Sequence, residues 1–128
     1  MSARDDDFVD AEELFSSAYL SADVAGSFVE RMVSRAVRVG RSTVHVYATV
    51  HQMVGSAFRT VFDLEGSLDG SRWFTIGSSL QVTAVGVKNS AANTAVAAVW
   101  VRLRASVPTG GSPVTQSIFS AGVAFSVP

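Results

Sequence analysis

The chain has 128 residues, a formal net charge of -1 and no cysteine. This length fits one domain with its own apolar core, and the lack of cysteine excludes disulfides and thiolate metal sites. The sequence has 10 Lys and Arg residues against 11 Asp and Glu residues, which is not the basic excess that binds nucleic acid or anionic lipid. Because 48% of the residues are hydrophobic and only 16% are charged, we expect apolar surface that another subunit covers.

The beginning of the chain is polar and acidic and has no apolar periodicity. It includes the run Asp5, Asp6 and Asp7, so we expect residues 1–13 to form a flexible acidic arm ahead of a β-sandwich domain over residues 14–128. No basic segment followed by an apolar core is present here, which argues against a secretory signal peptide. No apolar run approaches the ~20 residues that a membrane helix needs. We therefore expect no membrane partner, and a location in the cytoplasm or in a particle assembled there.

Residues 11–40 fit more than one structure. Apolar residues such as Leu14 and Ala18 recur at helical spacing, whereas the aromatic residues and valines suit strands and Gly26 and Gly40 can mark turns. We favour strands and keep helix and arm as alternatives.

From Arg41 onward the pattern becomes clear. Apolar and polar residues alternate over residues 44–50 and again over residues 60–65, which places one set on a core face and the other outside. Short β-rich segments separated by turn-forming residues are typical of a sandwich or barrel. The sequence predicts an all-β fold, a single antiparallel β-sandwich that is immunoglobulin-like or jelly-roll-like, with an extended N-terminal arm. Four further β-rich segments are residues 73–76, 80–87, 96–107 and 118–127.

The stretch LEGSLDGSRWFTIG, residues 64–77, predicts a hairpin. Asp-Gly between two runs rich in aromatic and aliphatic residues is a strong short-range hairpin signal. Asp bonds its own backbone in turns and tolerates the left-handed conformation, and Gly adopts it freely. The residues to which we assign the turn are Gly66, Asp69, Gly70 and Trp73.

The carboxylates Asp63, Glu65 and Asp69 admit three interpretations. Asp63 and Glu65 share one face of a strand, as a paired-carboxylate mechanism requires, and a calcium site is a second possibility. However, the spacing of an EF-hand is absent, and Asp69 is explained by the turn. We expect Asp63 and Glu65 to lie on the polar face of their strand, near Arg59 or arginines across the sheet.

The two histidines, His45 and His51, are expected on one strand. Their separation of about 20 Å, at 3.3 Å per residue, is too long for a shared metal ion. We expect solvated or interface histidines, no metal and no cofactor.

Aromatic and basic residues mark candidate contacts with other subunits. In the strand of residues 99–107, Trp100, Arg102 and Arg104 share the outer face, and arginine and tryptophan are enriched at protein interfaces. Trp73 and Trp100 can also stack on sugar rings, although core or edge packing is the more common use. Earlier in the chain, Arg31, Arg35 and Arg38 belong to a basic run whose complement in a neighbouring subunit would be Asp5 to Asp7.

Three stretches together resemble a class of small all-β structural proteins of tailed bacteriophages. They are DLEGSLDGSRWFTIG, VWVRLRASV and the alternating terminal strand SIFSAGVAFSV. The similarity covers residues 44–127 and departs from the usual pattern at Leu68, where such turns often carry Pro, and in a longer, Arg-rich first third. The resemblance implies a head decoration protein or a neck or tail component, and it implies no catalytic residues.

The functional hypothesis is therefore a non-enzymatic virion structural protein, with a capsid decoration or cement protein as the leading form. The alternatives are a ring-forming neck or tail component and a carbohydrate-binding β-sandwich module. The expected partners are copies of the chain itself and other virion proteins such as the major capsid protein. The expected location is the virion, assembled in the host cytoplasm.

Overall fold

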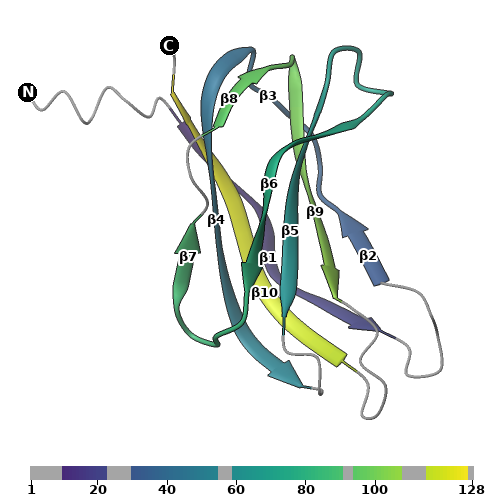
Figure 1. Cartoon of the computed structure of the whole chain (residues 1–128), viewed down its shortest axis with the longest axis vertical. Helices are drawn as coiled ribbons and strands as arrows, with labels where there is room; N and C mark the ends of the chain where they lie inside the picture. The colour runs from purple at the N-terminus through teal and green to yellow at the C-terminus, as the bar shows by residue number, and fades with distance from the viewer. Residues whose placement is uncertain (1–9, 23–29, 55–58, 91–93, 108–114, 127–128) are drawn as a thin grey trace, which may run out of the picture.

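Two five-stranded antiparallel sheets face each other in the computed structural model, which describes residues 10–22, 30–54, 59–90, 94–107 and 115–126 (Figure 1). In sheet A, β1 and β4 flank β10, and the other side of β4 pairs with β7 and β8. In sheet B, β5 lies between β9 and β6, and the other side of β9 pairs with β2 and β3. Sheet A contains β1 (Asp10–Ala22), β4 (Arg41–Val54), β7 (Lys88–Ser90), β8 (Thr94–Ala97) and β10 (Thr115–Ser126). Sheet B contains β2 (Glu30–Val33), β3 (Val37–Arg38), β5 (Thr60–Ser67), β6 (Phe74–Val82) and β9 (Trp100–Val107).

The apolar residues that alternate along the sequence are the buried residues of the strands, and the residues between them are more exposed. In β4, Val44, Ala48 and Val50 are fully buried, while Tyr47 between them is only half-buried on the outer face. Successive side chains of a strand point to opposite faces of its sheet, so one face of each sheet supplies the core. The predicted all-β sandwich is confirmed, and the described residues contain no helix.

Aromatic rings from both sheets meet at the centre of the core. Phe119 of sheet A contacts Phe15 of the same sheet and Phe62 of sheet B edge-to-face, with ring centroids 5.3 and 5.2 Å apart. This arrangement places the positive edge of one ring against the negative face of another. A buried hydroxyl pair, Thr60 and Ser117 at 2.7 Å, also joins the two sheets. Phe119 is therefore the apolar link between the layers.

The described residues of the first third of the chain form strands and contain no helix. β1, β2 and β3 confirm the strand interpretation there, while residues 23–29 of the ambiguous range lie outside the described residues. β1 begins at Asp10, so residues 10–13, which were assigned to the arm, lie in a strand paired with β10. The remainder of the predicted arm, residues 1–9, lies outside the described residues.

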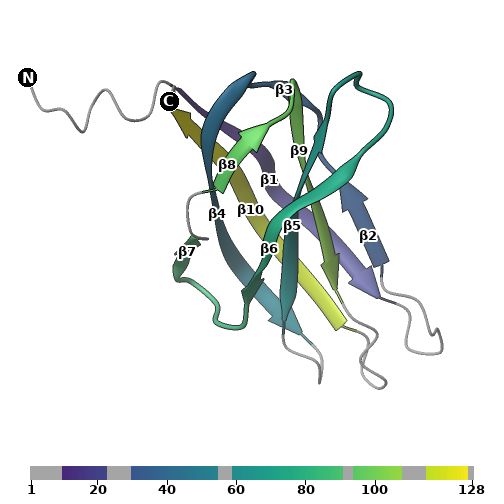
Figure 2. The same cartoon turned by 45° about the horizontal axis from the view of Figure 1, so that its top comes forward.

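Two predicted strand boundaries are wrong. Residues 73–76 and 80–87 were predicted as separate segments, but β6 runs unbroken over residues 74–82 and ends before residue 83. It remains one strand because residues 77–79 form a bulge opposite Asp63, with Gly77 at a φ of 69°. Residues 96–107 were predicted as one segment, but the chain crosses at Ala98–Val99 from β8 in sheet A to β9 in sheet B. Figure 2 shows this crossing beside β3.

We predict that Phe119→Ala lowers the free energy of unfolding by about 3–5 kcal/mol, because it removes the ring that both Phe15 and Phe62 contact and leaves a cavity. Urea unfolding followed by circular dichroism measures this change. Tyr19→Ala is the control, since Tyr19 is 54% exposed and its loss should change stability by no more than about 0.5 kcal/mol. Equal effects of the two substitutions would contradict the assignment of the core.

Candidate functional site

The outer face of sheet B carries a connected row of four charged side chains with a serine at one end and a tryptophan at the other. We call this row the charged ladder; in order it contains Ser79, Asp63, Arg104, Glu65, Arg102 and Trp73. It forms because β5 and β9 pair in a register that sets Asp63 opposite Arg104 and Glu65 opposite Arg102. Cross-strand neighbours lie about 5 Å apart at Cβ, within reach of an ion pair. The strand pairing of the backbone thus determines the electrostatics of this face.

Glu65 is the centre of the ladder. Its Oε1 accepts a hydrogen bond from Arg102 Nε at 2.8 Å, and its Oε2 lies 3.4 Å from Arg104 Nη1. Arg104 reaches Asp63 Oδ2 with Nη2 at 3.2 Å, and the Ser79 hydroxyl donates to the other oxygen of Asp63. The side chain of Glu65 is only 8% exposed, so its charge depends on these two arginines. A buried carboxylate without a cationic partner is strongly destabilising.

Trp73 completes the ladder beside the hairpin loop. The guanidinium of Arg102 lies 4.1 Å from the centre of the Trp73 ring, which is a close cation–π contact. Arg102 therefore binds a carboxylate and an aromatic ring at once, which the planar guanidinium allows and the lysine ammonium does not.

The ladder uses its charged groups within the chain. Each of the two carboxylates is paired with at least one arginine, and the two positive and two negative charges balance. Among the residues that the structure describes, no three His, Cys, Asp or Glu side chains come close enough to hold a metal ion. Asp69 is bound in the loop instead of joining Asp63 and Glu65. Asp63 and Glu65 thus form ion pairs on the face of sheet B, and Asp69 belongs to the hairpin loop.

The loop from residue 67 to residue 73 is built around Asp69. Its Oδ1 accepts hydrogen bonds from the backbone N–H groups of Arg72 and Ser71 and from the hydroxyl of Ser67. These bonds favour the ionised form and hold the pKa of Asp69 below its usual value. Gly70 has a φ of 81°, the left-handed conformation that the sequence predicted for the turn. The predicted hairpin is confirmed, but its loop is longer than a tight two-residue turn, and Gly66, which was assigned to the turn, lies within β5 opposite Phe74.

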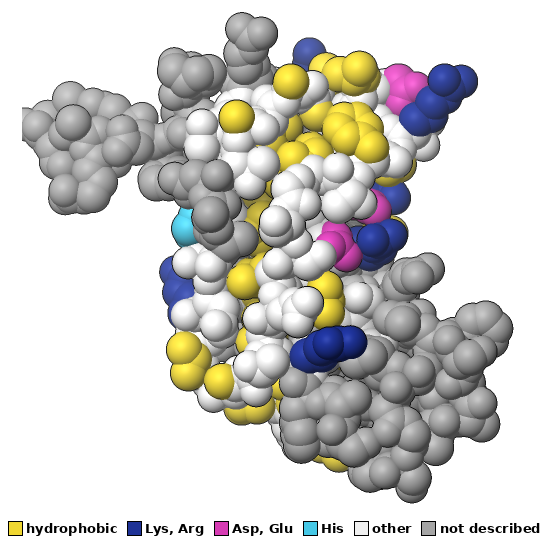
Figure 3. Space-filling model, viewed as in Figure 1, with side chains coloured by type: hydrophobic (Ala, Val, Ile, Leu, Met, Phe, Trp, Pro, Cys, Tyr) yellow, Lys and Arg dark blue, Asp and Glu magenta, His cyan; other side chains and the backbone are white. Residues whose placement is uncertain are grey.

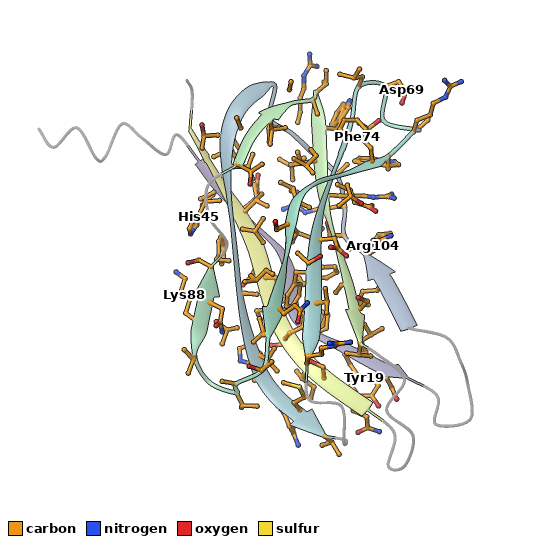
Figure 4. The ribbon with its side chains drawn as sticks, viewed as in Figure 1. Tyr19, His45, Asp69, Phe74, Lys88 and Arg104 are labelled. Atoms are coloured by element: carbon orange, nitrogen blue, oxygen red, sulfur yellow. The ribbon has the colours of Figure 1, made fainter. Side chains whose placement is uncertain are left out.

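The same loop exposes apolar surface at one end of the sandwich. Leu68 is 67% and Phe74 47% exposed, and Figure 3 shows apolar side chains near the top of this face, above the charged ladder. Asp69 and Phe74 lie at this end in Figure 4, and Tyr19 lies at the other. Behind the loop, Trp100 lies close to Gly70. The guanidinium of Arg38 lies 5.9 Å from the centre of the Trp100 ring. We call this end of the sandwich the hairpin end; it carries Leu68, Arg72, Trp73, Phe74, Trp100 and Arg38. Phe74 lies on the core-facing side of sheet B, like Ile76 of the same strand, whereas Trp100 and Arg38 lie on its outer side.

The structure separates the arginines of the basic run. Arg35 donates to Glu12 at 3.0 Å and to the backbone oxygen of Glu13, which ties β1 to the segment between β2 and β3. Arg38 lies in β3 over Trp100, and Arg31 pairs in β2 with Ser106 of β9. The predicted complement, Asp5 to Asp7, lies outside the described residues. The assignment of these groups as contacts with a partner stays a prediction.

The histidines both lie in β4, on the outer side of sheet A. His51 Nε2 lies 2.8 Å from the hydroxyl of Ser120, where β4 is bulged against β10. His45 lies further along the strand (Figure 4). On the same face, burial and the charges of Glu13 and Glu12 raise the pKa of Tyr47. The ammonium of Lys88 lies 5.1 Å from the centre of the Tyr47 ring.

Two contributors to these surfaces were missed from the sequence. Residues 77–79 lie between the predicted segments 73–76 and 80–87, but they form a bulge inside one strand that turns Ser79 toward Asp63. Glu12 was assigned to the arm, but it pairs with Arg35. A glycine inside an alternating segment is the signal that could have indicated the bulge.

Comparison with known proteins finds a likeness in structure and none in sequence family. No protein-family model and no curated protein matches the chain. The chain is similar to the crystal structure of PBSX exported protein XepA, with a TM-score of 0.60 and 17% sequence identity. The match covers 94% of this chain and 38% of that one, so the chain spans well under half of its length. At this identity the likeness shows the β-sandwich fold alone. Within the described residues, no helix is long and apolar enough to span a membrane.

We predict that Arg102→Met and Glu65→Gln each lower the free energy of unfolding by about 2–4 kcal/mol, because each leaves a polar group on this face without its partner. In the double variant the loss should be smaller than the sum by about 1–3 kcal/mol. Denaturant unfolding of the four proteins measures the coupling. Arg35→Met is the matched control, because its side chain is 56% exposed and its ion pair should contribute about 1 kcal/mol or less. Strictly additive effects of Arg102→Met and Glu65→Gln would disprove the ladder.

The ionised Asp69 side chain should make the stability of the protein depend on pH. Because the folded pKa of Asp69 lies below its ordinary value of 3.8, the stability that its charge contributes is present above that value and is lost as the pH falls through the folded pKa. Asp69→Asn should therefore be less stable than the wild type at neutral pH, and the two melting temperatures should converge as the pH falls below 3.8. Thermal melts over this range provide the measurement. A constant difference at every pH would contradict the assignment.

Proposed function

We propose that the protein is a non-enzymatic structural component of a phage particle, and that it acts as a decoration protein on the capsid. The observation that carries the non-enzymatic part is the charged ladder, in which each carboxylate is already paired with an arginine of the same chain. A general acid or base needs a group that is available to a substrate. The ladder instead makes the face of sheet B a fixed surface of balanced charge.

The phage part of the proposal is supported by two independent likenesses. The hairpin, the strand with two arginines and the alternating terminal strand resemble small structural proteins of tailed phages, and all three are β-structure in this fold. One solved structure that shares the fold is that of PBSX exported protein XepA. Both agree with a small β-sandwich that serves a particle.

The proposed mechanism is surface complementarity. A protein that binds only the assembled shell stabilises it by mass action, because binding lowers the free energy of the assembled state and leaves that of the free subunits unchanged. Many copies act together through multivalency, so each contact can be weak. The hairpin end supplies exposed apolar side chains and arginines, the residue types that interfaces use.

A ring in the neck or tail is the second candidate, favoured by the position of the hairpin end. Its exposed apolar residues Leu68 and Phe74 lie at one end of the sandwich, so a partner copy would contact it with a different surface. Heterologous contacts of this kind close into rings. The carbohydrate-binding alternative has less support, because Arg102 and Arg38 lie over the rings of Trp73 and Trp100.

We predict that the purified protein is a small oligomer by light scattering, that it co-sediments with undecorated capsids, and that it raises their melting temperature. Capsids that already carry the protein are the control and should bind no more of it. A large closed ring that ignores the shells would move the proposal to the neck or tail. A monomer that binds neither shells nor purified tails, and that mass spectrometry does not find in particles, would overturn the virion role.

A further inference from the structure

We propose that residues 1–9 of one copy bind the hairpin end of a second copy. This inference deepens the proposed function, because it names the partner of the hairpin end and the chemistry of the contact. The occupant is the acidic segment Asp5-Asp6-Asp7-Phe8-Val9, and the receiving surface is the apolar and cationic hairpin end.

The apolar half of the receiving surface is exposed, with Leu68 at 67% and Phe74 at 47%. Leu68 and Phe74 lie at either end of the hairpin loop, with Trp73 and Trp100 half-buried beside them. The other large apolar residues of β5 and β6 are more covered, because they face the core or the neighbouring strands. Exposed leucine and phenylalanine side chains on a charged rim mark an interaction site.

The cationic half is not neutralised within the described residues. Arg72 and Arg38 are both exposed, and neither forms an ion pair with a described residue. The anion beside them, Asp69, is held by three donors on one oxygen. The ladder arginines differ, since both are paired with carboxylates. Two arginines at the hairpin end therefore remain for a carboxylate from elsewhere.

The first nine residues match this surface in charge and in polarity. Three consecutive carboxylates precede Phe8 and Val9, so one short segment offers anions to Arg38 and Arg72 and apolar side chains to Leu68 and Phe74. Arginine and carboxylate form the stronger charge-assisted hydrogen bonds. An extended segment of nine residues reaches at most about 30 Å, which is enough to cross to a neighbouring sandwich.

The arrangement of the strands favours a second copy as the receiver. β1, from which the segment leaves, is an edge strand of sheet A and packs against β2 and β9, whereas β6 is the opposite edge of sheet B and packs against β4, β7 and β8. The start of β1 and the hairpin nevertheless lie at the same end of the sandwich (Figure 1). Copies placed side by side can each give one segment and receive another without crossing their own sandwich.

The two tryptophans report the contact. They are the only ones in the chain, and both belong to the hairpin end. In the wild type we expect an oligomer by sedimentation velocity. The full-length variant Asp5→Asn/Asp6→Asn/Asp7→Asn should dissociate at least tenfold more readily, and its tryptophan emission should move to longer wavelength.

The receiving side is tested by Leu68→Ser/Phe74→Ser, which alters exposed residues only and should weaken association similarly. Tyr19→Ser is the matched control, because Tyr19 is equally exposed but lies at the other end of the sandwich; it should associate like the wild type. A synthetic peptide of residues 1–9, added to the Asn variant, should restore the wild-type emission saturably. The same peptide with Asn at positions 5 to 7 should not.

Unchanged mass and emission in the Asn variant would overturn the proposal. A change in emission without a change in mass would also overturn it, because the segment would then bind its own sandwich. The experiment separates failure of this contact from failure of the virion role. If the Asn variant still co-sediments with shells, the proposed function stands and only the contact between copies is lost.

Discussion

Glu65 can be buried only because two arginines share its charge, and the outer face of sheet B is organised by that requirement. The register of β5 on β9 sets one arginine opposite each carboxylate, and the bulge in β6 turns Ser79 toward the second carboxylate. On the reverse of the same strands, Phe62, Leu64 and Leu103 enter the core. A slip by one residue would place the charges in the core and the apolar residues outside, so the ladder and the core specify the same register.

This coupling explains how much the sequence could predict. Alternation in β4, β5 and β9 identified the strands and which residues share a face, and Asp69-Gly70 located the hairpin, because both signals are local. The partners of Arg102 and Arg104 depend on which strands are neighbours, and Glu65 is 37 residues away from Arg102. The sequence placed Asp63 and Glu65 near Arg59 or arginines across the sheet, and the structure shows that the arginines across the sheet are their partners. The assignment of Trp100, Arg102 and Arg104 to a contact with another subunit stays a prediction.

The errors at strand boundaries have the same origin. Residues 96–107 form an unbroken β-rich segment in sequence, yet β8 and β9 belong to different sheets. Local preference favours extended backbone on both sides of Ala98 and Val99, and the change of sheet follows from which neighbours remain available for pairing. In β6 the opposite occurs: Gly77-Ser78-Ser79 has the composition of a turn, but pairing with β5 on both sides keeps the strand continuous around a bulge.

Arginine serves two purposes on this sandwich, and the difference indicates where the proposed association would take place. Arg102 and Arg104 neutralise carboxylates of the same sheet, so bringing another protein against them would gain little charge pairing and would cost desolvation of these ion pairs. Arg38 and Arg72 have no such partner among the described residues and lie at the same end of the sandwich as the exposed Leu68 and Phe74. A partner with carboxylates and apolar side chains gains from both. The hairpin end, rather than the charged ladder, is therefore the surface on which assembly should depend.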